Sequence, residues 1–264
     1  MLLLKKKPII NSQRNSIHFK KFLLSKNNKI VKSLIFGKKT SQAGRSSGRI
    51  TTYHRGGSGV KKLFRFINFT SSKNLSVILS IMYDPRRGAL VALCYNLLTS
   101  TFLNSLSTLN TFPGSIIFSF LTFPELKLGS ILPMSKIPAG SLIHSICINQ
   151  TQSKYIKSSG MFGLVTQKTL TFCKIKMPSG SIKKFPINIY CSLGVLNNAF
   201  LNNIVIGKAG RSRLSGKRPI VRGVAMNPVD HPHGGQTSGG TPSKTPWGLP
   251  TKGKPTRKKK NVTL

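Results

Sequence analysis

Hydrophobic and β-branched residues recur along the middle of the chain in short runs, separated by glycine, proline and polar turn residues. Runs bounded in this way are typical of strands. The pattern predicts strands at residues 63–69, 75–82, 89–93, 115–120, 141–148, 161–165, 169–177, 181–189 and 191–196. The first three should form a meander, and spacings near ten residues predict small barrels. The best candidate for a helix is 97–109, which lacks clear caps.

Both ends of the chain lack this pattern. Residues 38–59 are rich in glycine, serine, threonine and basic residues, and the chain beyond 202 is rich in glycine, proline and lysine. Segments so poor in large apolar residues cannot bury enough surface to offset the entropy of ordering. The predicted fold is mainly β, with two small barrels and long extended arms that another molecule orders. The predicted boundaries are a basic N-terminal extension at 1–59, barrels at 60–124 and 125–201, and a C-terminal extension at 202–264.

The uncharged stretch 88–124 is long enough to be weighed as a membrane segment, which needs about 20 mostly apolar residues. Serine, threonine and asparagine recur through it, and Pro113-Gly114 interrupts it. The stretch is therefore predicted to be sheet.

The four cysteines, Cys94, Cys147, Cys173 and Cys191, are widely separated and form no C-x-x-C pair. This spacing indicates neither a zinc ribbon nor a disulfide framework. We expect them to be buried small hydrophobic residues.

Charge is the strongest constraint on function. The chain of 264 residues has 42 lysines and arginines against three acidic residues, a formal charge of +39. Seventeen basic residues lie in 1–70 and thirteen in 201–264, whereas the 130 residues between hold twelve. Ordinary solvated faces mix both signs, so this imbalance predicts a polyanionic partner, namely nucleic acid.

Two strings mix glycine with arginine at close spacing, 44–49 and 54–57. Glycine allows the backbone to approach a sugar-phosphate surface, and guanidinium groups bind phosphates bidentately or stack on bases. A flexible linker is the alternative explanation for such strings.

The segment 223–235 places Asp230, His231 and His233 together. A metal site or a nucleophilic triad would use these residue types. However, no fourth ligand is evident and no G-x-S-x-G elbow is present. The prolines and glycines favour a rigid, shaped loop whose imidazoles contact phosphate, 2′-hydroxyl or base edges of RNA.

The C-terminal third resembles the signature of the universal large-subunit ribosomal protein L2 family. The residues that carry the resemblance there are Arg218-Pro219, Val221-Arg222-Gly223, 225–235, 245–248 and Thr251-Lys252-Gly253. Upstream, matching segments occur in the family's order, at 48–51, 54–57, 83–85, 132–133, 137–140, His144, 178–180 and 207–210.

The resemblance implies an OB-like barrel followed by an SH3-like barrel, with both termini threaded into large-subunit rRNA. It implies a non-enzymatic structural constituent of the large ribosomal subunit that binds rRNA near the peptidyl-transferase region and supports assembly and translation. The implied partners are large-subunit rRNA, other large-subunit proteins and the small subunit, with no membrane and no homo-oligomer. No cofactor is expected apart from Mg²⁺ or K⁺ shared with rRNA.

The residues expected to contact RNA are basic, glycine, histidine, asparagine and tryptophan residues of these segments. They are Arg45, Arg49, His54, Arg55, Gly56, Gly57, Lys61, Lys62, Arg86, Arg87, Lys208, Arg211, Arg213, Lys217, Arg218, Arg222, Asn227, His231, His233, Trp247, Lys252 and Lys254.

Heavy use of lysine, asparagine, isoleucine and phenylalanine is typical of an AT-rich organelle genome. We therefore expect a mitochondrial version of the family, in the ribosome of the matrix and organelle-encoded, with a plastid origin as the alternative. Two rival functions stay open, a free basic RNA chaperone outside the ribosome and a metalloenzyme or hydrolase that uses Asp230, His231 and His233.

Overall fold

The structure is a computed structural model that describes residues 3–19, 24, 29–38, 45–46, 49–50, 59–69, 74–119, 126–149, 152–235 and 241–253. The chain divides into two compact units. The first unit is Met1–Thr40 with Val60–Ser212, and the second is Ser41–Gly59 with Arg213–Leu264.

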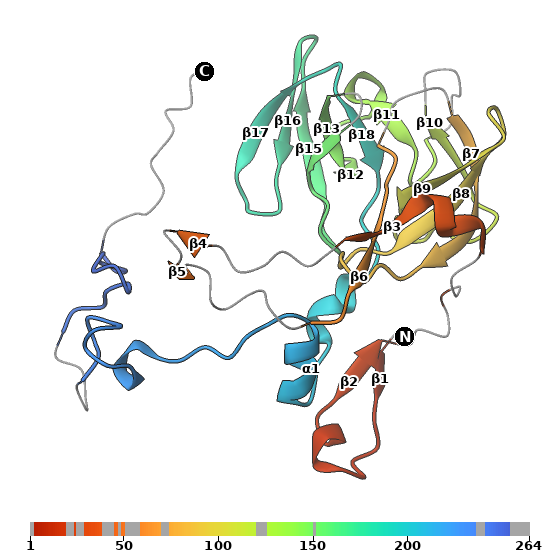
Figure 1. The fold of residues 1–264 in the computed structure, drawn as a ribbon. Coiled ribbons are helices and arrows are strands. Elements are labelled where there is room, and N and C mark those ends of the chain that lie inside the picture. The colour runs from red at the N-terminus through yellow and green to blue at the C-terminus, as the bar shows by residue number, and fades with distance from the viewer. Residues whose placement is uncertain are drawn as a thin grey trace. The chain divides into compact units, whose positions relative to one another are not determined.

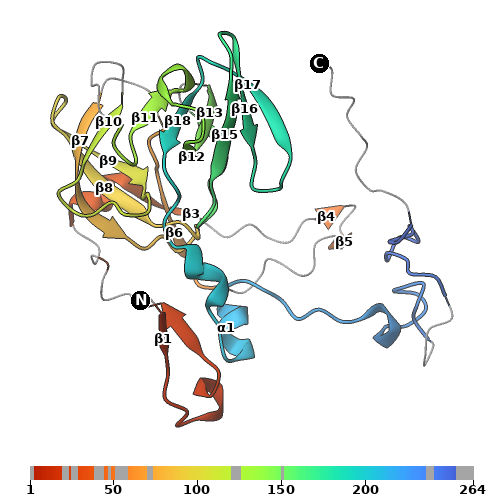
Figure 2. The same ribbon diagram turned by 180° about the vertical axis from the view of Figure 1, so that it is seen from behind.

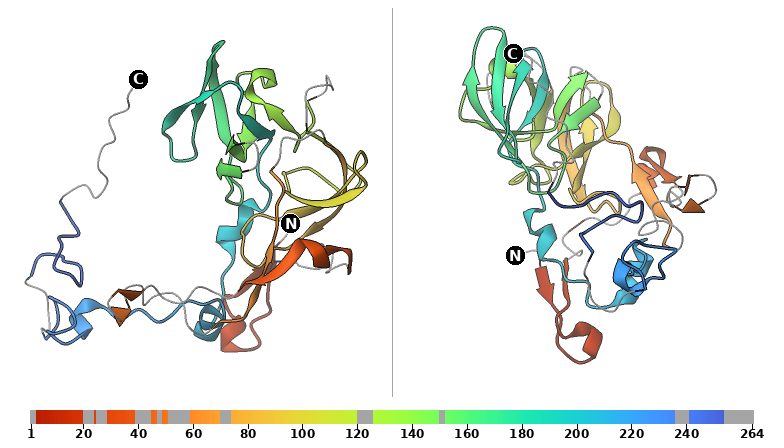
Figure 3. Two further views of the ribbon diagram at one scale, coloured as in Figure 1. Left: turned by 45° about the horizontal axis from the view of Figure 1, so that its top comes forward. Right: turned by 90° about the vertical axis from the view of Figure 1, so that its left-hand side faces the viewer.

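The first unit contains a ten-stranded sheet with the order β17-β16-β15-β12-β18-β11-β10-β7-β8-β9. Its strands gather in two groups, each around its own apolar core, and we call these groups the first and second lobe (Figure 1). Figures 2 and 3 show the same grouping from other directions, with the first lobe mainly yellow and the second green to teal.

The first lobe combines an antiparallel meander with a two-stranded ribbon. Residues such as Ile78, Val91 and Leu93 are fully buried in its core, and Leu34 and Ile35 pack against it from the ribbon side. The meander strands are β7 (Asn74–Met82), β8 (Val91–Asn96) and β9 (Thr101–Leu106), and β10 (Ile116–Ser119) pairs with the outer side of β7. The ribbon pairs β3 (Ile35–Lys38) with β6 (Lys62–Arg65).

The second lobe is built from short antiparallel strands around Ile143, Ile146 and Ile175, all at 0 % exposure. Strand residues alternate between this core and the surface, as in Phe172–Lys176, whose burial alternates along the strand. Its strands are β11 (Ile131–Pro133), β12 (Leu142–His144), β13 (Ile146–Asn149), β14 (Gln152–Tyr155), β15 (Gly163–Lys168), β16 (Phe172–Lys176), β17 (Ile182–Pro186) and β18 (Tyr190–Leu193).

The two lobes are joined through the sheet and through buried polar contacts. Among the described residues, Ser119 pairs with Ile131 in parallel and connects β10 to β11. His144 lies in the interior at 1 % exposure, with its Nε2 atom 3.0 Å from Thr108 Oγ1 and its Nδ1 atom 2.9 Å from Ser145 Oγ. Burial lowers the pKa of His144 to about 3, so the ring is neutral in the folded protein at pH 7.

An N-terminal hairpin completes the first unit. Strands β1 (Leu3–Lys5) and β2 (Ile17–Phe19) pair antiparallel, with the 3₁₀ turn η1 (Asn11–Gln13) between them. Ile17 exchanges two backbone hydrogen bonds with Val205, and Arg211 Nη1 lies 2.8 Å from His18 Nε2. The hairpin therefore packs on the segment that leads into helix α1 (Ala209–Leu214), as Figure 2 shows. Among the described residues, this unit also contains the 3₁₀ turns η3 (Lys29–Leu34), η4 (Met134–Lys136) and η5 (Ala199–Asn203).

In the described part of the second unit the elements are short. Strands β4 (Arg45–Ser46) and β5 (Arg49–Ile50) pair antiparallel, and η6 (Gly223–Ala225) opens a compact loop. Within the described part of the chain, no helix is long and apolar enough to cross a membrane.

The predicted mainly β fold with two small barrels is confirmed, and a strand overlaps each of the predicted strand segments. All four cysteines are buried and free, as expected, and burial raises the pKa of Cys94 and of Cys147 to about 11. The predicted domain boundaries stay predictions, although β3 lies within 1–59 and pairs with β6.

Two details of the predicted secondary structure were wrong. Residues 97–109 do not form a helix, because Asn96 Oδ1 accepts the N–H of Leu98 in a turn and β9 then pairs with β8. The predicted meander of 63–69, 75–82 and 89–93 is also wrong, since β6 pairs with β3, and the meander is β7-β8-β9.

Candidate nucleic-acid interface

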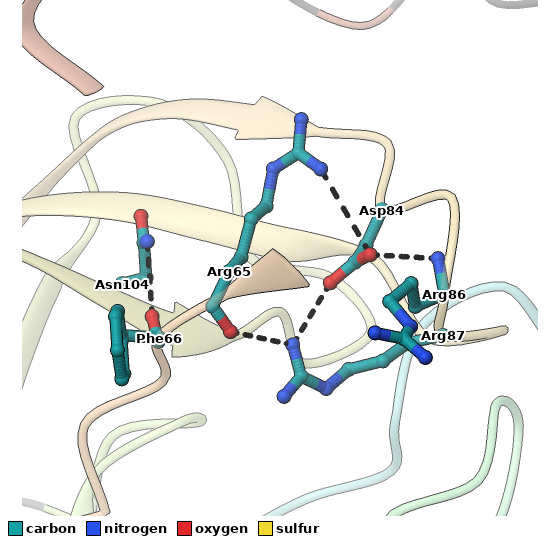
Figure 4. A network of polar contacts seen from close by, with 6 residues as sticks. All are labelled: Arg65, Phe66, Asp84, Arg86, Arg87 and Asn104. Atoms are coloured by element: carbon teal, nitrogen blue, oxygen red, sulfur yellow. Dashed lines mark hydrogen bonds and ion pairs between the residues drawn. The ribbon is translucent and has the colours of Figure 1, made fainter. Parts of the chain in front are cut away.

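A buried carboxylate organises the basic residues at the end of β7. Asp84 is fully buried, accepts the backbone N–H of Arg86 at 2.8 Å and accepts a charge-assisted bond from Arg87 Nη1 at 2.9 Å (Figure 4). Arg65 Nη1 lies 3.8 Å from Asp84 Oδ1, the same oxygen that accepts the Arg86 N–H. Arg87 Nη1 also donates to the carbonyl of Arg65 at 2.9 Å. Desolvation lowers the pKa of Arg65, and the nearby Asp84 opposes that shift. Asp84 thus fixes the direction of the Arg87 side chain, which is 26 % exposed.

Arg87 forms part of the wall of a pocket between the two lobes. The pocket has a volume of about 510 Å³, and its lining combines the cations of Arg87 and Lys157 with serine hydroxyls and apolar side chains. The other lining residues are Phe69, Gly88, Leu106, Ser158, Ser159, Met161, Leu201 and Asn202. A lining that combines two cations, serine hydroxyls and apolar side chains matches a phosphate joined to a sugar and base.

Two side chains pack closely against the backbone of this pocket at Gly88. A Cβ atom there would lie 2.4 Å from Leu201 Cδ2 and 2.9 Å from Ser159 Oγ, so a larger residue would displace both side chains. The Asn198 side chain donates to the Gly88 carbonyl at 2.6 Å and ties the two lobes together at this point.

Lys157 was missed by the sequence reasoning. Its Nζ atom donates to the carbonyl of Ser153 at 2.8 Å, which orients the ammonium group beside the pocket. The available signal was a lysine next to the hydroxyl-rich turn Ser158-Ser159-Gly160. Nothing in that short segment indicates that Lys157 and Arg87 line the same pocket.

In the second unit, the segment 223–235 folds into a compact loop, as the sequence predicted, and Arg222 directly precedes it; we call 222–235 the recognition loop. Backbone hydrogen bonds run from Gly234 N to the His231 carbonyl at 2.8 Å and from Gly235 N to the Met226 carbonyl at 3.1 Å. A Cβ atom at Gly234 would lie 2.2 Å from the carbonyl oxygen of Asn227, and one at Gly223 would lie 2.6 Å from the His231 ring. The loop is therefore shaped by contacts that only glycine permits.

The two histidines of the loop have different environments. His231 is buried at 8 % exposure, and its Nδ1 atom accepts the backbone N–H of His233 at 3.0 Å. The rings lie 4.8 Å apart at 57°. His233 Nε2 lies 3.0 Å from the Pro242 carbonyl and 3.2 Å from the Lys244 amide nitrogen, so it donates to the first or accepts from the second according to its tautomer.

This arrangement supports a structural role for His231 within the recognition loop. One nitrogen of each ring is bonded to the backbone. His233 is half-buried, and the side chain of Asn227 is exposed. Among the described residues, no group of three or more histidine, cysteine, aspartate or glutamate side chains is placed to hold a metal ion.

A second turn of this unit presents Trp247. The Thr245 N–H donates to the Leu249 carbonyl at 2.8 Å, and the Thr251 N–H donates to the Ser243 carbonyl at 3.0 Å, which closes a hairpin-like loop. Trp247 lies at its end and is 65 % exposed, an unusual position for a large apolar ring unless a partner covers it.

The remaining predicted contact residues differ in exposure. Lys61, Arg86, Lys208, Lys217, Arg218, Arg222 and Lys252 are exposed, whereas Lys62, Arg211 and Arg213 are half-buried. Arg211 also donates to the Ile206 carbonyl at 3.0 Å. Arg45 and Arg49 lie in β4 and β5. His54, Arg55, Gly56, Gly57 and Lys254 lie outside the described residues, and RNA contact by all of these side chains stays a prediction.

Comparison with known proteins gives a consistent result over both halves of the chain. Residues 31–104 match the family model described as Ribosomal Proteins L2, RNA binding N-terminal domain, and residues 127–248 match Ribosomal Proteins L2, C-terminal domain. The chain is 42 % identical to the large ribosomal subunit protein uL2m of Reclinomonas americana, over 98 % of this chain and 95 % of that protein. It is 40 % identical to uL2 of Wolbachia sp. subsp. Brugia malayi, covering 96 % and 93 %, and 39 % identical to uL2 of Rickettsia massiliae, covering 97 % and 94 %.

Proposed function

Because the chain belongs to the ribosomal protein L2 family, we propose that it is a structural component of the large ribosomal subunit and binds large-subunit rRNA. One observation carries the proposal: the match includes an RNA-binding domain and covers a chain with 42 basic and three acidic residues. Of the three acids, Asp84 is buried against arginines and Asp230 lies in the C-terminal loop. Most basic side chains therefore have no carboxylate within the protein to neutralise them, and phosphate groups would do so.

The geometry supports two kinds of RNA contact. In the first unit, Arg87 and Lys157 would hold phosphate at the pocket between the lobes, with the apolar lining residues against a sugar or base. In the second unit, the 222–235 loop and Trp247 would contact RNA through shape, hydrogen bonding and stacking. We place this unit near the peptidyl-transferase region, as the family resemblance implies, with a binding role rather than a catalytic one.

The proposal also covers the compartment of the protein and its neighbours in the ribosome. The similarity to uL2m, together with the composition rich in lysine, asparagine and isoleucine, supports a mitochondrial ribosome and an organelle-encoded chain. Other large-subunit proteins and the small subunit are the proposed protein neighbours. Any Mg²⁺ or K⁺ near the arms would be shared with rRNA phosphates.

The salt dependence of binding tests the proposal. Purified full-length protein is titrated with a large-subunit rRNA transcript over a range of salt concentrations. If about ten phosphates are neutralised, log affinity should fall against log salt with a slope of about −7 to −9. A slope near zero contradicts the proposal.

Sedimentation separates a ribosomal component from a free RNA chaperone. A component of the large subunit should stay with the particles through a high-salt gradient, whereas a chaperone should dissociate from them. Release of all the protein would favour the chaperone.

Matched lysine variants test the pocket. Lys157→Gln should weaken rRNA binding by about 1–3 kcal/mol and reduce the salt slope by about one. Lys176→Gln, an exposed lysine at the end of β16, is the control and should leave both unchanged. Equal effects of the two substitutions would show that only total charge matters, and the pocket assignment would then be wrong.

A further inference from the structure

Three phenylalanine rings share one face of the β3–β6 ribbon. Phe36 lies opposite Phe64 in the ladder, and Phe66 follows two residues after Phe64, so all three side chains are on the same side. Their ring centroids are 4.9 Å apart for Phe36 and Phe64, 4.7 Å for Phe36 and Phe66, and 5.9 Å for Phe64 and Phe66. We call this cluster the aromatic ribbon face.

The aromatic ribbon face is turned away from the core. Arg65 and Ile35, which are paired on the opposite side of the ribbon, are directed inward, and Arg65 is 4 % exposed against Asp84. Phe66, by contrast, is 55 % exposed and Phe36 is 37 % exposed. The inner face packs on the core, whereas the rings of Phe66 and Phe36 lie at the surface, where a partner can reach them.

The backbone beneath the exposed ring is held in place. The Phe66 N–H donates to the Leu34 carbonyl at 3.1 Å, and the Phe66 carbonyl accepts a bond from Asn104 Nδ2 at 3.0 Å (Figure 4). Asn104 itself is buried at 1 % exposure. A fixed, exposed aromatic ring loses little conformational entropy when a flat partner binds on it.

Cations surround the same face. The Cζ atoms of Arg87 and Arg86 lie 4.9 and 5.9 Å from the Phe64 ring centroid, and Lys62 shares the face by its place in the ladder. The nearby carboxylate of Asp84 is buried behind the ribbon and is already bonded to Arg87. Aromatic rings flanked by cations match a nucleobase joined to its phosphate, and an acidic protein surface would satisfy the cations but not the rings.

We propose that the aromatic ribbon face is a stacking platform for an unpaired nucleotide of large-subunit rRNA. The base stacks on Phe66 and Phe36, and Arg86 with Lys62 binds the adjoining phosphates. This inference rests on the proposed rRNA-binding function and names one of its contacts.

Leucine substitutions test the platform, because leucine keeps the apolar bulk and removes the π-face. Phe36→Leu and Phe66→Leu are made singly and together in the full chain, with Phe112→Leu as the control, since Phe112 is 66 % exposed on another loop. Each platform variant should weaken rRNA binding about five- to tenfold, and the double variant more. The salt slope should stay at the wild-type value, because no charge is removed. A double variant that binds within about twofold of wild type, with its circular dichroism unchanged, overturns the platform.

A second measurement does not depend on the variants' affinity. p-Benzoylphenylalanine at position 66, in protein assembled into large subunits, should crosslink on irradiation to an rRNA nucleotide. A crosslink to a ribosomal protein at that position would overturn the inference. If the proposed rRNA-binding function itself is wrong, the wild-type protein will show no salt-dependent binding to rRNA. If only the stacking platform is wrong, the wild-type protein will bind rRNA and the leucine variants will bind equally well.

Discussion

Replacing Asp84 by asparagine should strongly destabilise the first lobe. The substitution keeps the shape and one oxygen that accepts the Arg86 N–H, but it removes the charge that faces Arg65 and Arg87. Removing one partner of a buried ion pair costs about 3–5 kcal/mol, since the remaining charge stays desolvated. Arg87 is 26 % exposed and can turn toward water, whereas Arg65 at 4 % cannot, so we expect about 3 kcal/mol.

Urea unfolding of the RNA-free protein at pH 7 measures this loss, since urea adds no ions that would screen charge. With a denaturant slope of about 1–3 kcal/mol per molar, a loss of about 3 kcal/mol lowers the midpoint by roughly 1–3 M. Asp230→Asn is the matched control, because Asp230 is exposed and the substitution changes net charge by the same unit. It should shift the midpoint by less than about 0.3 M.

Two results would refute the reasoning. If Asp84→Asn unfolds within about 0.5 kcal/mol of wild type, the buried carboxylate does not hold the arginines in place. If Asp230→Asn loses as much stability as Asp84→Asn, the effect comes from overall charge repulsion rather than from this network.

Three further predictions concern pH, loop shape and the N-terminus. Burial lowers the pKa of His144 from 6.5 to about 3, so between these pH values the unfolded chain binds a proton that the folded protein does not. The free energy of unfolding should therefore be highest above pH 6.5 and fall by up to about 1.4 kcal/mol per pH unit below it, and His144→Gln should flatten this slope in urea titrations at several pH values. Gly234→Ala should abolish incorporation into large subunits, measured by sedimentation, because its Cβ would lie 2.2 Å from the Asn227 oxygen; normal incorporation would mean that the loop shape is not needed. Deleting residues 1–30 should leave both lobes folded by circular dichroism and proteolysis, since the core clusters begin at Leu34; loss of the β signal would contradict this.

Strand positions were predictable because they depend on local alternation. The run at 75–82 corresponds to β7 at Asn74–Met82, and 181–189 contains β17 at Ile182–Pro186. Strand partners were not predictable in the same way. β6 pairs with β3, more than twenty residues earlier, and the pattern within either strand carries no information about that choice. The candidate helix 97–109 failed for the same reason, since pairing with β8 outweighed weak local preference.

The candidate site also has a part that could be predicted from local sequence and a part that could not. The 222–235 loop could be predicted from its own residues, because its prolines, glycines and histidines make their contacts within a dozen positions. The pocket of Arg87 and Lys157 could not, since it forms only where the two lobes approach at Gly88.

The sequence by itself determined that the partner carries negative charge and is a nucleic acid, because net charge is a sum over residues and does not depend on where they lie. It also determined the strand content and the family resemblance. Only the tertiary structure decided which basic groups are used inside the fold, such as Arg65, and which rings, such as Phe66, are left at the surface. The physical reason is that ion pairing and burial depend on distances of a few ångströms between residues far apart in the chain.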